Sequence, residues 1–311
     1  LIGMVFILMF LKRFIKLDFQ KIISTPANSE ILRFSLPLMF VSAIGIIMHW
    51  IDILMLGIYS DANAVGMYHP IERTAGLIRM ILFAFAGIFA PLFSQYFYEE
   101  NFVKMKQIYQ LSTKWIFVAT TPLFLFLILF SSPMLMLFGS EFNNGLALQI
   151  LTLGIMMQAF FGLGSSSLTM SGFSNLNLFN VLVALAVNIL LNIFLIPEYG
   201  IIGAATATTT ALFVISVLRF LENYFILKLN IFSFKLFKPL IAGILTFILA
   251  KLSENYIFRF IDYSSSFYVL IFYLFISILM VFVGYFSFYF FLGIDREDRD
   301  MIESLKTRIS R

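Results

Sequence analysis

The chain contains no cysteine and only two histidines, His49 and His69, so disulfide frameworks and thiolate metal sites are excluded and a histidine metal centre is not indicated. Charged residues are also scarce, at 12% of the 311 residues, about half the share in a soluble domain. The net charge is +4, and the basic residues lie in short connections rather than on one exposed face. This composition does not indicate nucleic-acid binding.

Motifs of enzymes are missing as well. The sequence has no Gly-rich nucleotide loop followed by lysine and no HExxH helix. Its outer connections reach only about a dozen residues, too few to build a catalytic domain. The sequence therefore predicts no catalytic residues, no metal and no cofactor.

Long apolar runs fill the chain, which is 61% hydrophobic with a mean hydropathy of +0.97. A bilayer core takes about 20 helical residues to cross, and only helices or closed barrels cross it with every backbone group paired. The sequence predicts an all-α integral membrane protein with about eight transmembrane helices. They are expected at 31–59, 74–97, 111–130, 146–170, 176–196, 201–221, 236–252 and 267–292, and polar connections at 60–73 and 99–110 separate the first three.

The ends of the chain differ from its middle. Residues 1–11 form an apolar run too short to cross a bilayer, with basic residues after it rather than before, which is unlike a signal peptide. We interpret residues 1–30 as the end of a preceding transmembrane helix and a linker. Residues 31–228 would form a six-helix lobe, 229–292 two further helices, and 293–311 a charged tail.

Basic residues are divided unequally between the two sides of the predicted bundle. Seventeen Lys and Arg residues fall on the side that holds both chain ends and four on the other. Because basic residues concentrate in cytoplasmic loops, both ends are predicted to be cytoplasmic.

Charged side chains at membrane depth are costly and therefore candidates for function. Gly45, His49 and Asp52 share one face of the first helix. Asp52 lies roughly 10 Å from the outer end at 1.5 Å per residue, and Arg79 of the next helix is expected at a similar depth. An Asp52–Arg79 ion pair is predicted, with Arg73 as the rival partner. Either it lines a polar cavity or it only joins the two helices.

The remaining candidates are less specific. Arg33, at the cytoplasmic mouth of the first helix, would meet an anionic headgroup or extend to the lipid interface. His49 would take part in proton coupling or simply donate a hydrogen bond, and Glu72 and Arg73 are expected to be solvated. Four amides lie within or near the helices, Gln95 and Gln158 as candidates to line a cavity, and Asn188 and Asn192 as polar contacts between helices.

Several segments resemble the Wzx-type polysaccharide flippases of the multidrug/oligosaccharidyl-lipid/polysaccharide exporter superfamily. They are 31–38 (ILRFSLPL), 51–57 (IDILMLG), 64–68 (AVGMY), Pro91, 137–142 (LFGSEF), 188–192 (NILLN) and 195–208 (LIPEYGIIGAATAT), the last being the most specific. His69-Pro70 departs from the family pattern, in which a small residue is usual. The similarity runs from about Ile31 to Leu221.

The resemblance implies a fold of two six-helix lobes, often with two additional helices, so this chain would be the second lobe plus those two. It implies a carrier in the plasma (inner) membrane that moves a lipid-linked oligosaccharide, on a polyprenyl phosphate or diphosphate, to the outer leaflet by alternating access. Arginine suits the phosphate, which makes Arg33, Arg79 and Arg73 the candidates. A multidrug/cation antiporter, a membrane glycosyltransferase or ligase, and a non-transporting assembly subunit stay open as alternatives.

Overall fold

The computed structural model describes residues 29–142, 144–231, 234–256 and 263–293. The expected helix stub at 1–11 and the charged tail lie outside these residues. Within them the chain is helical and contains no strand, which confirms the predicted all-α class. The helices are α3 (Ser29–Tyr59), α4 (Ala62–Ala75), α5 (Leu77–Tyr98), α6 (Phe102–Leu129), α7 (Ser131–Leu135), α8 (Gly145–Phe160), α9 (Gly164–Met170), α10 (Ser174–Phe225), α11 (Phe237–Tyr256) and α12 (Phe267–Phe291), with 3-10 turns η1 (Met136–Phe138) and η2 (Phe234–Leu236).

Helix α10 turns back on itself in the middle of its 52 residues. Pro197 interrupts it, and Gly200 has φ 55° and ψ −125°, a conformation that residues with a Cβ rarely adopt. A Cβ on Gly203 would lie 2.2 Å from the carbonyl oxygen of Leu195, so the second arm begins in tight contact with the first. The two arms correspond to the predicted helices 176–196 and 201–221.

Five described helices are long and apolar enough to span a membrane, and a sixth span arises if α8 and α9, which meet at 42°, are taken together. Counting both arms of α10 and the 20-residue helix α11, each of the eight predicted crossings has a helical counterpart. The chain is a multi-pass membrane protein.

The polar connections predicted at 60–73 and 99–110 are wrong, because helices α4 and α6 occupy most of these residues. Asp61 caps α4 by accepting a hydrogen bond from the Ala64 backbone N–H at 2.7 Å, so the helix starts at Ala62. Asn101 caps α6 in the same way, through the Lys104 N–H at 3.1 Å, so that helix starts at Phe102. Polar residues after a capping side chain continue a helix as readily as apolar ones. As a result, α4 and α5 together form one span of 37 residues, Ala62–Tyr98.

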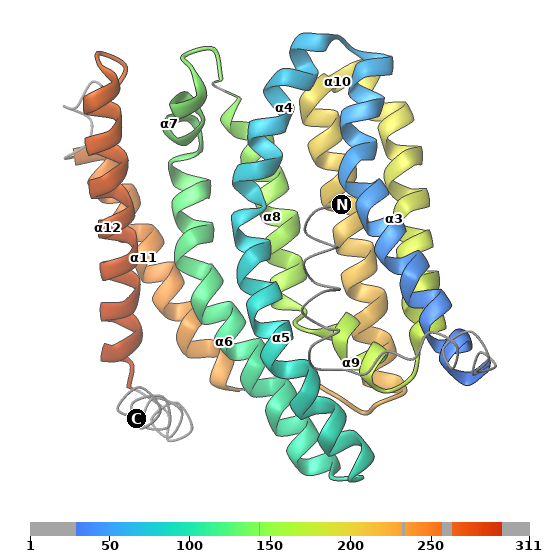
Figure 1. Ribbon diagram of the computed structural model, residues 1–311. Coiled ribbons are helices and arrows are strands. Elements are labelled where there is room, and N and C mark those ends of the chain that lie inside the picture. Colours follow the sequence, from blue (N-terminus) through green and yellow to red (C-terminus); the bar gives the residue numbers. More distant parts are fainter. Residues whose placement is uncertain (1–28, 143, 232–233, 257–262, 294–311) are drawn as a thin grey trace, which may run out of the picture.

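Figure 1 shows the helices as a bundle in which α11 and α12 stand to one side. Helix α10 packs on α3 and α8, α5 packs on α6, and α6 packs on α8. Helices α11 and α12 pack on each other and on α6. This arrangement is compatible with the predicted division into a lobe (31–228) and two further helices (229–292), which stays a prediction.

Candidate functional site

A cavity of about 740 Å³ opens among helices of residues 31–228, and we call it the lobe cavity after the predicted lobe. Its wall combines residues of α3, α4, α5, α8, α9 and both arms of α10, and most of them are apolar. The ionisable and amide side chains in the wall are His49, Asp52, Glu72, Arg79, Gln158 and Arg219.

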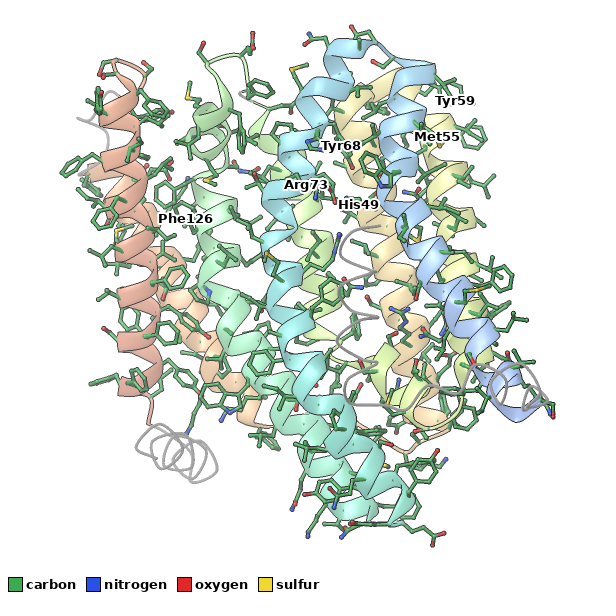
Figure 2. All side chains as sticks on the ribbon, viewed as in Figure 1. His49, Met55, Tyr59, Tyr68, Arg73 and Phe126 are labelled. Carbon is green, nitrogen blue, oxygen red and sulfur yellow. The ribbon has the colours of Figure 1, made fainter. Side chains whose placement is uncertain are left out.

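The hairpin of α3 and α4 determines which of these side chains meet. Its tip is Ser60–Asp61, and residues equally far from the tip on the two limbs lie opposite each other. His49 therefore faces Glu72, and Asp52 faces Tyr68. Figure 2 labels His49 on α3 and Tyr68 on α4.

His49, Glu72 and Arg79 form an ionisable triad in the wall. The Nδ1 atom of His49 lies 2.8 Å from Glu72 Oε1, and Arg79 Nη1 lies 3.6 Å from the same oxygen. Glu72 is 7% exposed, and its other oxygen, Oε2, is buried without a hydrogen-bond partner in the described part of the chain. The arginine is thus close to its carboxylate without a tight hydrogen bond, and 27% of its side chain is exposed.

Asp52 lies in a separate group, the Asp52 cluster, with Tyr68, Asn188, Asn192 and Thr208. The Tyr68 hydroxyl donates to Oδ2 at 2.9 Å, and the Thr208 hydroxyl donates to the same oxygen. The amides of Asn188 and Asn192 donate to Oδ1 at 3.1 and 2.7 Å. Four neutral donors therefore stabilise a carboxylate that is only 3% exposed.

The predicted Asp52–Arg79 ion pair is wrong, and so is Arg73 as the partner of Asp52. Because α4 begins at Ala62, Arg79 lies much farther from the hairpin tip than Asp52 does, and the residue at the depth of Asp52 is Tyr68. Arg79 pairs with Glu72 instead. Glu72, which was expected to be solvated, is buried in the cavity wall.

The other candidates are divided between the cavity and the surface. Gln158 lines the lobe cavity, whereas Arg33, Arg73 and Gln95 do not belong to its wall. Arg33 and Arg73 are exposed. Gln95 is exposed near the end of α5 and donates to Glu99 at 2.8 Å.

The two asparagines join helices, as polar packing residues do. Both are buried, and both donate to Asp52 across the contact between α10 and α3. Asn188 also donates to Thr208 on the other arm of α10, at 2.9 Å. The two asparagines thus contact the face of α3 that carries Asp52.

Three residues of this site were not among the candidates: Tyr68, Thr208 and Arg219. Both Tyr68 and Thr208 are uncharged; Tyr68 lies in the predicted connection 60–73, and Thr208 lies in the predicted helix 201–221. Arg219 was counted only among the seventeen basic residues of the cytoplasmic side, yet it lines the lobe cavity and donates to Asn177 Oδ1 at 2.8 and 3.2 Å. Its position inside an otherwise apolar helix is the signal that would have identified it.

Comparison with known proteins gives three further observations. Residues 1–97 match the family model described as polysaccharide biosynthesis protein. An uncharacterized membrane protein of Methanocaldococcus jannaschii is 25% identical over 195 residues, which are 59% of this chain and 38% of that protein. A probable low-salt glycan biosynthesis flippase, Agl15 of Haloferax volcanii, is 25% identical over 177 residues, which are 56% of this chain and 38% of that protein. The chain thus spans about two fifths of the length of these relatives.

Among solved structures, the lipid II flippase MurJ in an inward closed conformation superposes with a TM-score of 0.60 at 19% sequence identity. The match covers 87% of this chain and 55% of MurJ. At that identity the likeness concerns the fold. Together with the family model and the glycan flippase relative, it confirms the resemblance seen in the sequence: the chain is similar in sequence and in fold to the polysaccharide flippases of the multidrug/oligosaccharidyl-lipid/polysaccharide exporter superfamily.

Proposed function

We propose that this chain is one lobe of a membrane flippase that moves a lipid-linked oligosaccharide from the cytoplasmic to the outer leaflet by alternating access. The observation that carries the proposal is the ionisable triad in the wall of the lobe cavity. A charge at membrane depth costs several kcal/mol, about 3 or more at a helix centre. Three ionisable groups at one place in an apolar wall therefore point to an ionic ligand.

Arg79 is the residue that we assign to the phosphate of the lipid carrier. It lies 3.6 Å from Glu72, too far for a strong hydrogen bond, so its guanidinium can exchange one anionic partner for another. A phosphate that replaces the carboxylate keeps the buried charge compensated and gains two parallel N–H···O bonds. Glu72 meanwhile stays paired with His49 at 2.8 Å, so the released carboxylate keeps a partner.

The apolar surface beside the triad fits a second lobe. Ile46, Trp50 and Phe83 line the lobe cavity and are 63%, 44% and 69% exposed. Apolar side chains next to charged ones suit a wall that faces another lobe, and we propose that the carrier cavity forms between the two. By the distribution of basic residues, both described ends of the chain face the cytoplasm of a plasma (inner) membrane.

The role of Arg79 can be tested with a matched pair of variants, Arg79→Gln and Arg73→Gln, which lie on the same membrane span. Loss of a charged hydrogen bond costs about 1.5–3 kcal/mol, so Arg79→Gln should slow translocation about 10- to 100-fold. Arg73→Gln removes the same charge from an exposed position outside the cavity wall and should leave the rate within about twofold.

The measurement uses the full-length protein in proteoliposomes with a fluorescent polyprenyl-diphosphate-linked oligosaccharide. Dithionite quenches label exposed on the outside, so the rate of translocation is read directly. Equal rates for the two variants would refute the role of Arg79, and no transport by the wild-type protein would refute the flippase.

A cation-driven multidrug antiporter is a second candidate, which the oxygen atoms around Asp52 favour. The Asn192 carbonyl oxygen is buried without a donor in the described residues. If the side-chain amides of Asn188 and Asn192 rotated by 180°, their oxygens rather than their NH₂ groups would face the Asp52 carboxylate. Together with the Thr208 hydroxyl, these oxygens would form a set of ligands suited to a hard cation. Ethidium efflux driven by a Na⁺ or proton gradient, and lost in Asp52→Asn, would support this function. Vesicles that show no gradient-driven efflux would exclude it.

A further inference from the structure

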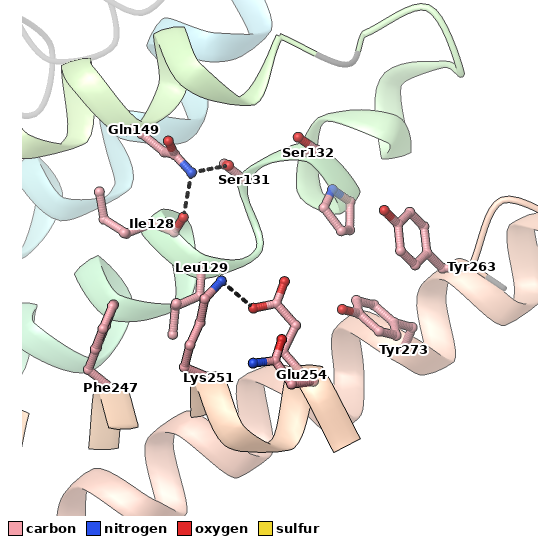
Figure 3. Close-up of a pocket in the computed structure, with 12 residues that line it drawn as sticks. Ile128, Leu129, Ser131, Ser132, Gln149, Phe247, Lys251, Glu254, Tyr263 and Tyr273 are labelled. Carbon is pink, nitrogen blue, oxygen red and sulfur yellow. Dashed lines mark hydrogen bonds and ion pairs between the residues drawn. The ribbon is translucent and has the colours of Figure 1, made fainter. Parts of the chain in front are cut away.

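A second cavity, of about 610 Å³, lies between the lobe and the two further helices, and we call it the α11 cavity (Figure 3). Its wall is formed by the end of α6, by α7, α8, α11 and α12, and by Tyr263 before α12. It shares no lining residue with the lobe cavity.

Helix α8 separates the two cavities. Gln149 lines the α11 cavity, while Leu151 and Gln158 line the lobe cavity. Residues two apart on a helix point in nearly opposite directions, and residues seven apart share a face. The two cavities therefore lie on opposite sides of one helix, so a group held in the α11 cavity does not occupy the lobe cavity.

The charges of the α11 cavity cancel each other. Lys251 Nζ lies 2.8 Å from Glu254 Oε2, and both side chains are partly exposed. They are the only two charged residues in the wall that the structure describes. A neutral cavity has no excess positive charge to attract a phosphate or another anion, which favours an uncharged ligand.

Hydrogen-bonding groups extend from the rim into the cavity. The Gln149 amide donates to the Ile128 carbonyl at 2.9 Å and to the Ser131 hydroxyl at 3.0 Å, which fixes its orientation. Its carbonyl oxygen Oε1 accepts no hydrogen bond from the described residues and is free for a ligand hydroxyl. The Glu254 carboxylate and the exposed Asn255 amide add acceptors and donors at the rim.

Two tyrosine rings form the side of the cavity opposite Gln149, as Figure 3 shows. The Tyr263 and Tyr273 rings lie 5.0 Å apart, tilted by 38°. Tyr273 is only 3% exposed, so the aromatic surface offered to a ligand belongs mainly to the partly exposed Tyr263, with Tyr273 packed against it. A ligand that matches both sides has one apolar face and a rim of hydroxyls, which is the chemistry of a pyranose ring.

We propose that the α11 cavity binds an uncharged saccharide, held between the tyrosine pair and the polar groups of Gln149, Glu254 and Asn255. Its volume lies within the range of ligand sites, about 300–1,000 Å³, and accommodates one or two sugar rings. The saccharide is either the glycan of a lipid-linked precursor or a free oligosaccharide. The inference goes beyond the proposed transport and does not depend on it.

The test is saturation-transfer NMR on the full-length protein in nanodiscs. The probes are the methyl glycosides of glucose, galactose, mannose and N-acetylglucosamine, and maltose. The wild-type protein should transfer saturation to at least one probe. Tyr263→Ala removes one ring of the pair and should weaken binding about tenfold. Tyr256→Ala, an equally large truncation at a 73% exposed position outside the cavity wall, should change nothing.

Two further variants keep the test decisive if Tyr263→Ala does not fold. Glu254→Gln changes a partly exposed rim residue and should weaken binding about threefold, because hydroxyls donate more strongly to a carboxylate than to an amide. Arg79→Gln should bind the probes normally, so loss of transport and loss of sugar binding are distinguishable. If a lipid-linked oligosaccharide displaces the soluble probes, the natural ligand is the glycan of a lipid-linked precursor. If the probes bind but are not displaced, the natural ligand is a free glycan.

Two results would overturn the proposal. One is the lack of saturation transfer to any probe, or equal transfer in Tyr263→Ala and Tyr256→Ala. The other is native mass spectrometry in phosphatidylglycerol nanodiscs that finds a bound lipid in the wild-type protein and none in Lys251→Gln. That result would assign the cavity to an anionic headgroup.

Discussion

Asp52→Ala would leave four buried donors without the acceptor that they share. Hydrogen bonds between membrane helices are worth about 0.6 kcal/mol each on average, and those to a charged group up to about 3 kcal/mol. For the four hydrogen bonds of the Asp52 cluster, a loss of at least about 2.5 kcal/mol of unfolding free energy follows. At about 2–4 °C per kcal/mol, the midpoint of thermal unfolding should fall by at least about 5 °C.

Asp52→Asn should behave differently, because two of the four donors are hydroxyls. Its side-chain oxygen can accept from the amides of Asn188 and Asn192, as Oδ1 of Asp52 does. Its NH₂ can then donate to the hydroxyls of Tyr68 and Thr208, which rotate from donor to acceptor. The expected loss is below about 1 kcal/mol, or roughly 3 °C.

Thermal unfolding in detergent, followed by the fluorescence of the two tryptophans, measures both variants. An alanine variant as stable as the wild-type protein would refute the hydrogen-bond argument. An asparagine variant as unstable as the alanine variant would show that the negative charge, rather than the number of acceptors, stabilises α3 against α10.

Two more predictions concern packing and topology. Gly154→Ala should destabilise the protein by about 1–3 kcal/mol, because a Cβ at this position would lie 2.8 Å from the Thr209 Cα. The control is Gly87→Ala, where a Cβ would meet nothing within 4 Å. It should be neutral or slightly stabilising in the same unfolding assay. The natural absence of cysteine makes single-cysteine labelling specific. A membrane-impermeant maleimide added outside should label Ser140→Cys and not Lys106→Cys, and the reverse pattern would invert the proposed orientation.

The helices were largely predictable from the sequence because the bilayer imposes a length and a composition on each crossing. The turn at Pro197 and Gly200 was predictable too, since both residues restrict or permit specific backbone angles. The starts of α4 and α6 were missed because polar residues at a helix end do not differ in composition from a loop. The N-cap residues Asp61 and Asn101 carried that information.

The site was predictable in its residues but less so in its pairing. His49, Asp52 and Arg79 do line one cavity, yet which of them meet depends on the register of a hairpin. Moving the start of α4 from the expected residue 74 to Ala62 shifts every partner by about three turns. Asp52 thereby meets a hydroxyl instead of a guanidinium. Contacts such as Thr208 with Asp52, 156 residues apart, depend on tertiary packing that local patterns do not encode.

The position of α8 between two cavities has a thermodynamic consequence. If a ligand in one cavity favours one position or rotation of this 16-residue helix, the wall of the other cavity changes with it. By linkage, the factor by which the first ligand alters the affinity for the second equals the factor by which the second alters the affinity for the first. Under that condition α8 would couple α11 and α12 to what occupies the lobe cavity, although neither helix lines that cavity.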